Sequence, residues 1–206
     1  MYLPPPFDFP EHARTIVREN PLAQLISNDD EGFPFVTHLP IKLQKHSSNP
    51  ELDLLLGHVA KVNPHAAFLK QRPEVLITFM GPQAYMTPQV YPDLVRVPTW
   101  SYVAVHIKAV VRILEGEEAT DALLKQLIAD HEPAYAHQWQ GLPESYTVPM
   151  LNGIVAFEMK LLAVQSKIKL NQHRPESHAA MHALYAAGSE SEKGLALWMR
   201  RLGMVS

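Results

Sequence analysis

The stretch VAVHIKAVVRI, residues 103–113, decides the fold class, because apolar side chains recur at every second position over its whole length. The residues between them include His106, Lys108 and Arg112. Successive side chains of a strand point to opposite faces of a sheet, so this alternation predicts a long strand with one buried face and one polar face. The apolar positions of this stretch are Val103, Val105, Ile107, Ala109, Val111 and Ile113.

Shorter stretches on either side also have strand character. Leu22–Ser27 is a compact apolar run, and the polar cluster Asn28–Gly32 that follows it suits a hairpin turn into a second strand, Phe33–Leu43. Three more strands are predicted: Leu52–His58, Val75–Met80 and Ile154–Ala163. We expect the second of these to be apolar on both faces and to end at Gly81-Pro82. About six strands are enough to close a barrel.

Helices are expected around these strands. Three are predicted before the C-terminal tail: Pro10–Asn20, Pro64–Gln71 and Glu117–His131. The tail from Glu176 onward is predicted to be a helical hairpin that breaks at Gly188 and restarts at Ser189, with Glu192 completing a capping box. Two stretches rich in proline and aromatic residues are expected to be long ordered loops: 82–99 and 132–152.

The composition is that of an ordinary globular protein. Of 206 residues, 47% are hydrophobic and 19% are charged, and 18 Lys and Arg against 21 Asp and Glu give a net charge of −3. No overall positive field therefore draws the chain to DNA or to anionic lipid. The absence of cysteine excludes disulfides, thiolate metal sites and a cysteine nucleophile. With neither a secretory pattern in Met1–Pro6 nor an apolar run of about 18 residues, we expect a soluble cytoplasmic protein with no membrane association.

The segment GHVAKVNP, residues 57–64, is the first candidate site. It places His58, Lys61 and Asn63 between the end of a predicted strand and the start of a predicted helix. Backbone donors at a helix N-terminus attract phosphate, and a nearby lysine adds positive charge. The alternative is that His58 packs in the core and Lys61 is simply solvated.

Two further candidates involve proline. Pro40 in the segment Thr37–Pro40 cannot donate to a sheet, which predicts an edge or a bulge where a planar heterocycle could meet free backbone groups. The alternative is a proline that only protects the edge from aggregation. Tyr85 and Trp100 lie beside proline-containing loops and could stack on a ligand or seal a dimer interface, although core packing is the commoner role.

The last candidate is the segment KLNQHR, Lys169–Arg174, which carries two cations and two amides. An exposed basic linker is the alternative. His178 and His182 are spaced to share a metal, but no third ligand is marked, and we predict no metal site. The sequence contains no glycine-rich phosphate loop, no G-x-S-x-G and no H-E-x-x-H, so kinase, serine hydrolase and zinc protease functions have no support.

In their order along the chain, these motifs resemble the PaiB family of negative transcriptional regulators. The resemblance spans nearly the whole chain and rests on the opening Met1–Pro4 and on the following segments: Thr37–Pro40, Gly57-His58, Asn63-Pro64, Gly81–Tyr85, Val97–Trp100 with Tyr102, Val105-His106 and Lys169–Arg174. In the last segment, Asn171 and His173 replace the usual serine and asparagine of the family ending K-L-S-Q-N-R.

The resemblance implies an α+β, mainly β fold: an antiparallel split β-barrel of six or more strands, like that of pyridoxamine phosphate oxidases, with peripheral helices and a C-terminal helical hairpin. Residues 1–174 would form the FMN-binding domain and 175–206 a helical extension. FMN would lie at a homodimer interface, with its phosphate at His58, Lys61 and Asn63 and the edge of its isoalloxazine ring at Thr37–Pro40. The full set of implied cofactor contacts is Thr37, His38, Leu39, Pro40, His58, Val59, Lys61, Asn63, Tyr85, Trp100, Lys169, Gln172 and Arg174.

The sequence leaves the function open between three classes. The first is a flavin-dependent regulator of the PaiB type. The second is an FMN-dependent oxidoreductase, a flavin reductase or pyridoxamine phosphate oxidase-like enzyme, whose substrate and catalytic residues no motif identifies. The third is a haem-binding split barrel, for which several of the 11 histidines could supply an axial ligand. Because the chain is acidic overall, we expect at most weak direct binding to DNA.

Overall fold

The computed structural model describes residues 1–49, 53–93 and 95–206, and these form two compact units. Unit 1 contains Met1–Asn20, Phe79–His106 and Gln165–Ser206. Unit 2 contains Pro21–Thr78 and Ile107–Val164. The division predicted at residue 174 stays a prediction.

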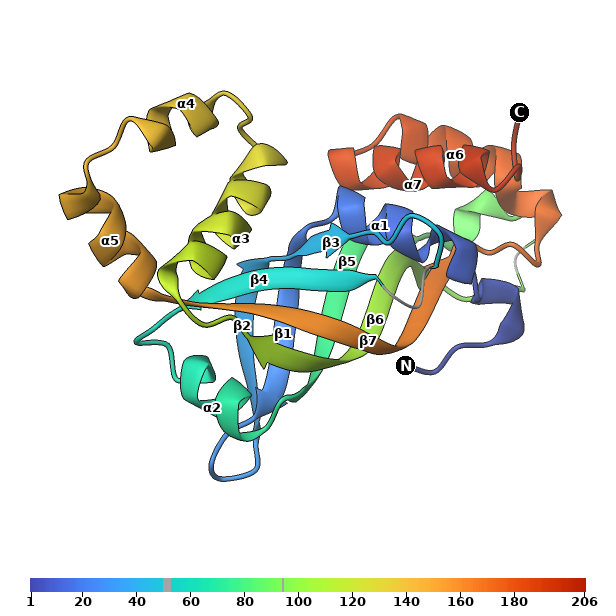
Figure 1. Ribbon diagram of the computed structural model, residues 1–206. Coiled ribbons are helices and arrows are strands. Elements are labelled where there is room, and N and C mark those ends of the chain that lie inside the picture. Colours follow the sequence, from blue (N-terminus) through green and yellow to red (C-terminus); the bar gives the residue numbers. More distant parts are fainter. Residues whose placement is uncertain (50–52, 94) are drawn as a thin grey trace. The chain divides into compact units, whose positions relative to one another are not determined.

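Seven strands form one sheet within the described residues (Figure 1). They are β1 Leu22–Asn28, β2 Pro34–Pro40, β3 Lys42–Gln44, β4 Leu54–Ala60, β5 Glu74–Met86, β6 Thr99–Ile113 and β7 Ile154–Lys169. The strand order is β2-β1-β5-β6-β7-β4-β3, and the pairings of β1 with β2 and β5, and of β4 with β3 and β7, are antiparallel. Strands β5, β6 and β7 each begin in one unit and end in the other.

The helices are short. Among the described residues, four are 3₁₀ helices: η1 Pro5–Phe7, η2 Pro10–His12, η4 Pro88–Val90 and η5 Pro175–Ser177. The α-helices are α1 Ala13–Glu19, α2 His65–Gln71, α3 Glu117–Ala129, α4 Tyr135–Gln140, α5 Glu144–Asn152, α6 His178–Ala186 and α7 Glu190–Arg201. In the described part of the chain, no helix combines the length and the apolar character needed to cross a membrane.

The hairpin between β1 and β2 confirms the predicted turn. The carboxylate of Asp29 accepts the backbone N–H of Glu31 at 2.9 Å and that of Phe33 at 2.8 Å. Gly32 has a φ of +86°, a left-handed conformation that glycine adopts without strain. The side chain of Asp29 and the flexibility of Gly32 therefore fix the register in which β2 returns along β1.

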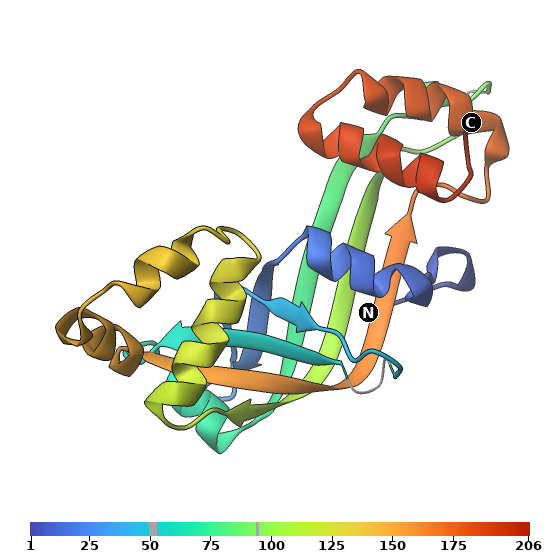
Figure 2. The same ribbon diagram turned by 45° about the horizontal axis from the view of Figure 1, so that its top comes forward.

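The core of unit 2 depends on close packing around β4. A Cβ atom at Gly57 would lie 2.6 Å from Cδ1 of Ile41 and 3.1 Å from the ring of the fully buried Phe157, so any larger residue would force these two side chains to shift. On the opposite face of β4, Leu56 packs with Leu123 and Leu127 of α3 in one buried cluster. Figure 2 shows α3 lying over β4 and β7.

In unit 1, α6 and α7 form the predicted helical hairpin (Figures 1 and 2). The restart at Ser189 is confirmed, since both bonds of the capping box are present. Arg201 of α7 binds the carboxylate of Glu19 of α1 with two guanidinium nitrogens, at 2.6 and 2.8 Å. Trp198 is 2% exposed, which places the inner face of α7 in the core of this unit.

The structure corrects several element boundaries. The predicted strand Phe33–Leu43 is two strands, because the chain leaves β2 at Pro40 and the N–H of Ile41 donates to the carbonyl of Pro21 instead. Gly81-Pro82 does not end β5. A Cβ at Gly81 would lie 3.2 Å from that of Val103, so the glycine lets β5 continue close to β6.

Other expectations were wrong in burial or in length. β5 alternates between buried and partly exposed residues and is not apolar on both faces. β7 continues six residues beyond Ala163, to Lys169. The stretch 132–152 is not a loop, because it holds α4 and α5, and Pro149 lies inside α5. The predicted residue Leu52 lies outside the described residues.

Candidate functional site

The residues expected to contact FMN divide between the two units, and each group is described separately. Unit 2 holds Thr37, His38, Leu39, Pro40, His58, Val59, Lys61 and Asn63. Unit 1 holds Tyr85, Trp100, Lys169, Gln172 and Arg174.

In unit 2, a buried histidine joins β1, β2 and the turn after β4. The ring of His65 lies 2.7 Å from Oγ1 of Thr37 through Nδ1 and 2.9 Å from Oγ of Ser27 through Nε2. Asn63 donates to Thr37 Oγ1 at 3.2 Å and accepts the backbone N–H of His65 at 3.0 Å. Ser27, Thr37, Asn63 and His65 thus form one continuous hydrogen-bonded network, and two of its members are expected site residues.

Burial keeps His65 neutral at physiological pH. Its side chain is completely buried, and this burial lowers the pKa to about 4. Burial disfavours the charged imidazolium because the charge loses its hydration. At neutral pH, one ring nitrogen therefore donates a hydrogen bond and the other accepts one.

At the end of β4 lie two polar side chains, His58 and Lys61, for which the described residues offer no hydrogen-bond or ion-pair partner. Nδ1 of the half-buried His58 is shielded from solvent and has no hydrogen-bond partner in the described residues, and burial lowers the pKa of this imidazole. Three residues later, the side chain of Lys61 is exposed, while its backbone N–H donates to the carbonyl of Gly153 at 2.8 Å. A buried polar atom left unpaired is costly, so a hydrogen bond from any group that reached Nδ1 of His58 would be favourable.

The helix that follows does not offer the free donors expected from the sequence. The first N–H groups of α2, those of His65, Ala66 and Ala67, donate to Asn63 Oδ1, to the carbonyl of Asn63 and to the carbonyl of Pro64. Each of these N–H groups already donates to an acceptor within the protein, so none of the three is free for a ligand. A phosphate at this point would be held by side chains and not by the helix N-terminus.

The segment Thr37–Pro40 has one exposed and one buried face. His38 and Pro40 are exposed, and the ring of His38 lies 3.2 Å from the amide nitrogen of Gln24. Leu39 and Val59 are in the core at 4% and 3% exposure, so any contact they make with a ligand must come from the backbone. β2 stands at the end of the strand order, which confirms the edge predicted from Pro40.

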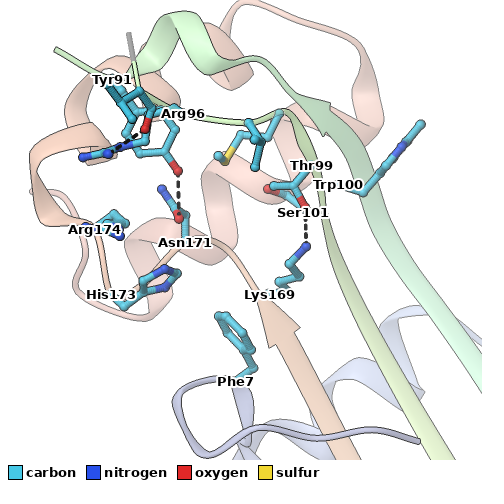
Figure 3. Close-up of a pocket in the computed structure, with 13 residues that line it drawn as sticks. Phe7, Tyr91, Arg96, Thr99, Trp100, Ser101, Lys169, Asn171, His173 and Arg174 are labelled. Atoms are coloured by element: carbon cyan, nitrogen blue, oxygen red, sulfur yellow. Dashed lines mark hydrogen bonds between the residues drawn. The ribbon is translucent and has the colours of Figure 1, made fainter. Parts of the chain in front are cut away.

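Unit 1 contains a cavity of about 590 Å³ (Figure 3). Its wall comes from η1, the segment between β5 and β6, and the loop after β7. The polar residues that line it include Arg96, Thr99, Ser101, Lys169, Asn171 and Arg174. The predicted segment Lys169–Arg174 therefore lies at a cavity, whereas Arg96 was not found from the sequence because no motif contains it.

Lys169 is held at the wall of this cavity. Its ammonium group donates to Oγ1 of Thr99 at 2.5 Å and lies 6.0 Å from the centre of the Tyr102 ring. Burial lowers the pKa of Lys169, Tyr102 opposes this effect, and the like charge of Lys167 adds to it. Gln172, in contrast, uses both ends of its amide within its own loop, donating to Ile168 O and accepting from the N–H of Leu170.

Asn171 fixes the shape of the loop. It has a φ of 64°, the one left-handed residue other than glycine in the described chain. Its amide donates to Ser177 at 2.8 Å and accepts from the hydroxyl of Tyr91 at 3.2 Å. The sequence marked Asn171 only as a departure from the family ending, since neither contact is visible from spacing.

Tyr85 and Trp100 form an exposed pair within β5 and β6 rather than in loops. Their ring centres are 6.3 Å apart in an edge-to-face arrangement, and they are 51% and 55% exposed. Figure 3 shows the side chain of Trp100 pointing away from the other labelled residues. Trp100 also contributes to the lining of the cavity, whereas Tyr85 does not, and the exposed parts of both rings are available to a ligand or to a partner surface.

The two histidines spaced for a metal have other partners. The ring of His178 lies 3.1 Å from the carbonyl of Asn171, and that of His182 accepts a hydrogen bond from Arg200 at 3.1 Å. The described residues contain no group of three or more His, Asp or Glu side chains that could hold a metal ion.

Residues 1–162 match the protein family described as "Putative FMN-binding domain". The chain belongs to this family. It is also similar to the protease synthase and sporulation protein PAI 2 of Bacillus subtilis strain 168, with 31% identity over 184 residues, 86% of this chain and 84% of the relative. The resemblance to PaiB and the expected cofactor, FMN, are both confirmed.

Solved structures support the fold. The flavocytochrome Anf3 of Azotobacter vinelandii superposes with a TM-score of 0.61 at 13% identity, covering 79% of this chain and 68% of that one. The FAD- and haem-binding protein of Mycobacterium smegmatis gives 0.60 at 12% identity, covering 79% and 72%. With the seven-stranded antiparallel sheet, these likenesses confirm the split β-barrel and its α+β class.

The residues at the end of β4 fit one part of FMN. A phosphate needs a cation and hydrogen-bond donors, and Lys61, Asn63 and the unpaired imidazole of His58 are groups of these kinds. When bound, FMN supplies redox chemistry through its isoalloxazine ring, and the protein supplies position and polarity.

Proposed function

We propose that this chain is an FMN-binding homodimer of the PaiB type, a negative regulator of gene expression in the cytoplasm whose output depends on the bound flavin. Membership of the FMN-binding family and the likeness to PAI 2 support this proposal. The acidic net charge supports a role through the flavin or a partner protein rather than through direct contact with DNA.

The observation that carries the proposal is the end of β4. Within the part of the chain that the structure describes, Nδ1 of His58 and the side chain of Lys61 have no partner, and they lie beside a turn that the network of His65 and Thr37 holds in place. We assign the phosphate of FMN to Lys61, with His58 and Asn63 as hydrogen-bonding partners. The edge strand β2 offers its backbone at Thr37–Pro40 to the isoalloxazine ring, with the exposed His38 beside it.

The remaining expected contacts belong to unit 1. Tyr85 and Trp100 are proposed to stack on the flavin or to pack against the second subunit, because exposed aromatic pairs of this kind favour an interface. Lys169, Gln172 and Arg174 were also assigned to the cofactor by resemblance. Their surroundings support a separate assignment for Lys169, which is argued below.

Replacing Lys61 tests the phosphate assignment. We expect Lys61→Ala to weaken the binding of FMN about ten- to hundredfold, which is the usual effect of losing a charge-assisted hydrogen bond. The affinity for riboflavin should not change, because riboflavin has no phosphate. Fluorescence titration of both flavins measures the difference. Lys160→Ala removes an equally exposed lysine from β7 and serves as the matched control. Equal loss of both flavins would show that Lys61 acts through folding.

An FMN-dependent oxidoreductase is the second candidate, and the cavity of about 590 Å³ in unit 1 favours it because its volume would accommodate a small-molecule substrate. Stoichiometric consumption of NADH or NADPH by the purified flavoprotein, with an added electron acceptor, would establish the enzyme. If the protein consumes NADH or NADPH no faster than free FMN does, the oxidoreductase is excluded and the regulator remains as the proposed function.

A further inference from the structure

The cavity in unit 1 has an excess of positive charge. Arg96, Lys169 and Arg174 line it, and within the described lining there is no acidic side chain. Asp93 binds Arg96 at 2.8 Å, and Glu176 lies 3.8 Å from Arg96 and 4.0 Å from Arg174. The two carboxylates thus compensate the two arginines, and Lys169 remains as the uncompensated charge.

Two features of the wall leave cationic groups incompletely satisfied. Lys167 and Lys169 share the ring of Tyr102, at 5.3 and 6.0 Å from its centre, so two ammonium groups repel each other across one aromatic ring. Nε of Arg96 is buried and makes no hydrogen bond with any residue that the structure describes. An anion in the cavity would relieve the repulsion and would give the lysine a charged partner.

The rest of the cavity is aromatic and apolar. The rings of Phe7 and His173 pack edge to face with their centres 5.9 Å apart. The guanidinium carbon of Arg96 lies 5.1 Å from the centre of the Tyr91 ring. Met86 and Val97 also line the cavity. Figure 3 shows Phe7, His173 and Lys169 around one opening. The volume lies within the range of roughly 300–1,000 Å³ that is usual for small-molecule sites.

Asn171 indicates that the loop is held in shape for a ligand. A left-handed conformation costs free energy in any residue with a side chain and persists only where neighbouring contacts impose it. Here Ser177 and Tyr91 impose it through the asparagine amide. Such conformations gather at binding sites, where they position side chains before the ligand arrives.

We infer that this cavity binds a small aromatic monocarboxylate, with Lys169 as its anion contact and the rings of Phe7, Tyr91 and His173 around its apolar body. The single uncompensated positive charge matches one carboxylate better than a doubly charged phosphate. This ligand goes beyond the proposed function, because the phosphate of FMN is assigned to Lys61.

Benzoate is the probe for this site. We expect calorimetric titration of the FMN-loaded protein to show benzoate binding, and benzamide, which has the same ring without the charge, to bind at least about tenfold more weakly. Lys169→Met should lower the affinity for benzoate by a similar factor, and Lys169→Arg should retain the affinity. Lys160→Met, on the same strand β7 but outside the cavity, should bind as the unmodified protein does.

Three outcomes would overturn the inference. The first is equal affinity for benzoate and benzamide, and the second is full affinity for benzoate in Lys169→Met. The third is loss of both FMN binding and benzoate binding in Lys169→Met, because that result would assign the cavity to the flavin. Retained FMN and an unchanged unfolding temperature in Lys169→Met show that the variant is folded. If the unmodified protein fails to bind FMN, the proposed function fails, and benzoate titration of the flavin-free protein still decides this inference.

Discussion

At the scale of single residues, the buried imidazole of His65 makes stability depend on pH. In the unfolded chain it takes up a proton near its ordinary pKa of 6.5, whereas in the folded chain burial delays protonation until about pH 4. Between these values the unfolded state binds more protons, so stability decreases as the pH falls from about 6.5 to 4. We expect this residue to account for about 2 kcal/mol of that loss.

Urea unfolding at pH 7.5 and pH 5 checks the expectation. His65→Gln cannot titrate in this range and still bears an amide that can replace part of the network with Ser27 and Thr37. The variant should be less stable at neutral pH, and its stability should change less between the two pH values. The same pH dependence in both proteins would assign the effect to other histidines, such as His58 or His106, whose pKa values burial also lowers.

Asn171 combines a strained backbone with two side-chain hydrogen bonds, and two substitutions separate these effects. Asn171→Ala should cost about 2–3 kcal/mol, because it loses the bonds to Ser177 and Tyr91 and keeps the left-handed conformation. Asn171→Gly loses the same bonds and relieves the strain, so it should cost about 1 kcal/mol less. Chemical denaturation measures both, and equal losses would mean that the backbone is not strained.

How much the sequence predicted at the residue scale depends on whether a residue acts through its neighbours in the chain. His58, Lys61 and Asn63 were proposed because they stand between a strand and a helix, where local pattern carries information, and their role stays a prediction. His65 was missed, although it lies two residues further on, because its partners Ser27 and Thr37 are 38 and 28 positions away. Arg96 was missed for the same reason, since the cavity around it is assembled from distant segments.

At the scale of elements, boundaries set by nearby side chains were predicted better than boundaries set by distant strands. The turn at Asp29 and the restart at Ser189 were correct because each depends on side chains within four residues. The ends of β5 and β7 were wrong because neighbouring strands extend them beyond what their own residues favour, as the close approach of Val103 to Gly81 illustrates. Pairing between distant strands is not encoded in local propensity.

The capping box of α7 gives a prediction at this scale. Ser189→Ala removes the side-chain acceptor for the N–H of Glu192 and should destabilise the protein by about 1 kcal/mol. Ser189→Asp retains an acceptor and should cost much less. Thermal unfolding of both variants checks this, and equal destabilisation would mean that the cap does not limit the stability of the helical hairpin.

At the scale of the whole molecule, we predict a homodimer. Tyr85 and Trp100 are more than half exposed, and exposed aromatic pairs are usually covered by a partner. Sedimentation should show a dimer at micromolar concentration, and Trp100→Ser should shift it toward monomer. Tyr146→Ser, which changes an equally exposed aromatic residue of α5, should leave the dimer intact. A protein that sediments only as monomer with FMN bound would contradict the prediction.

The last prediction concerns DNA, for which the helical hairpin of unit 1 is the natural candidate because a helix pair can enter the major groove. Its cations are already engaged. Arg200 donates to His182, Arg201 binds Glu19 with two nitrogens, and Lys193 pairs with Glu190 at 2.7 Å. Binding to phosphates would require these pairs to break in a protein whose net charge is −3.

We therefore expect the purified protein to bind duplex DNA weakly and without sequence preference at about 150 mM salt, and to release it steeply as salt increases, because few phosphate contacts are available. Fluorescence anisotropy with a labelled duplex measures this, and the Glu19→Gln variant tests the cause. Freeing Arg201 from its carboxylate should strengthen nonspecific binding slightly and leave selectivity unchanged. Tight, sequence-selective binding by the unmodified protein would show that the hairpin reads DNA directly. The role of the flavin would then be to modulate that DNA binding.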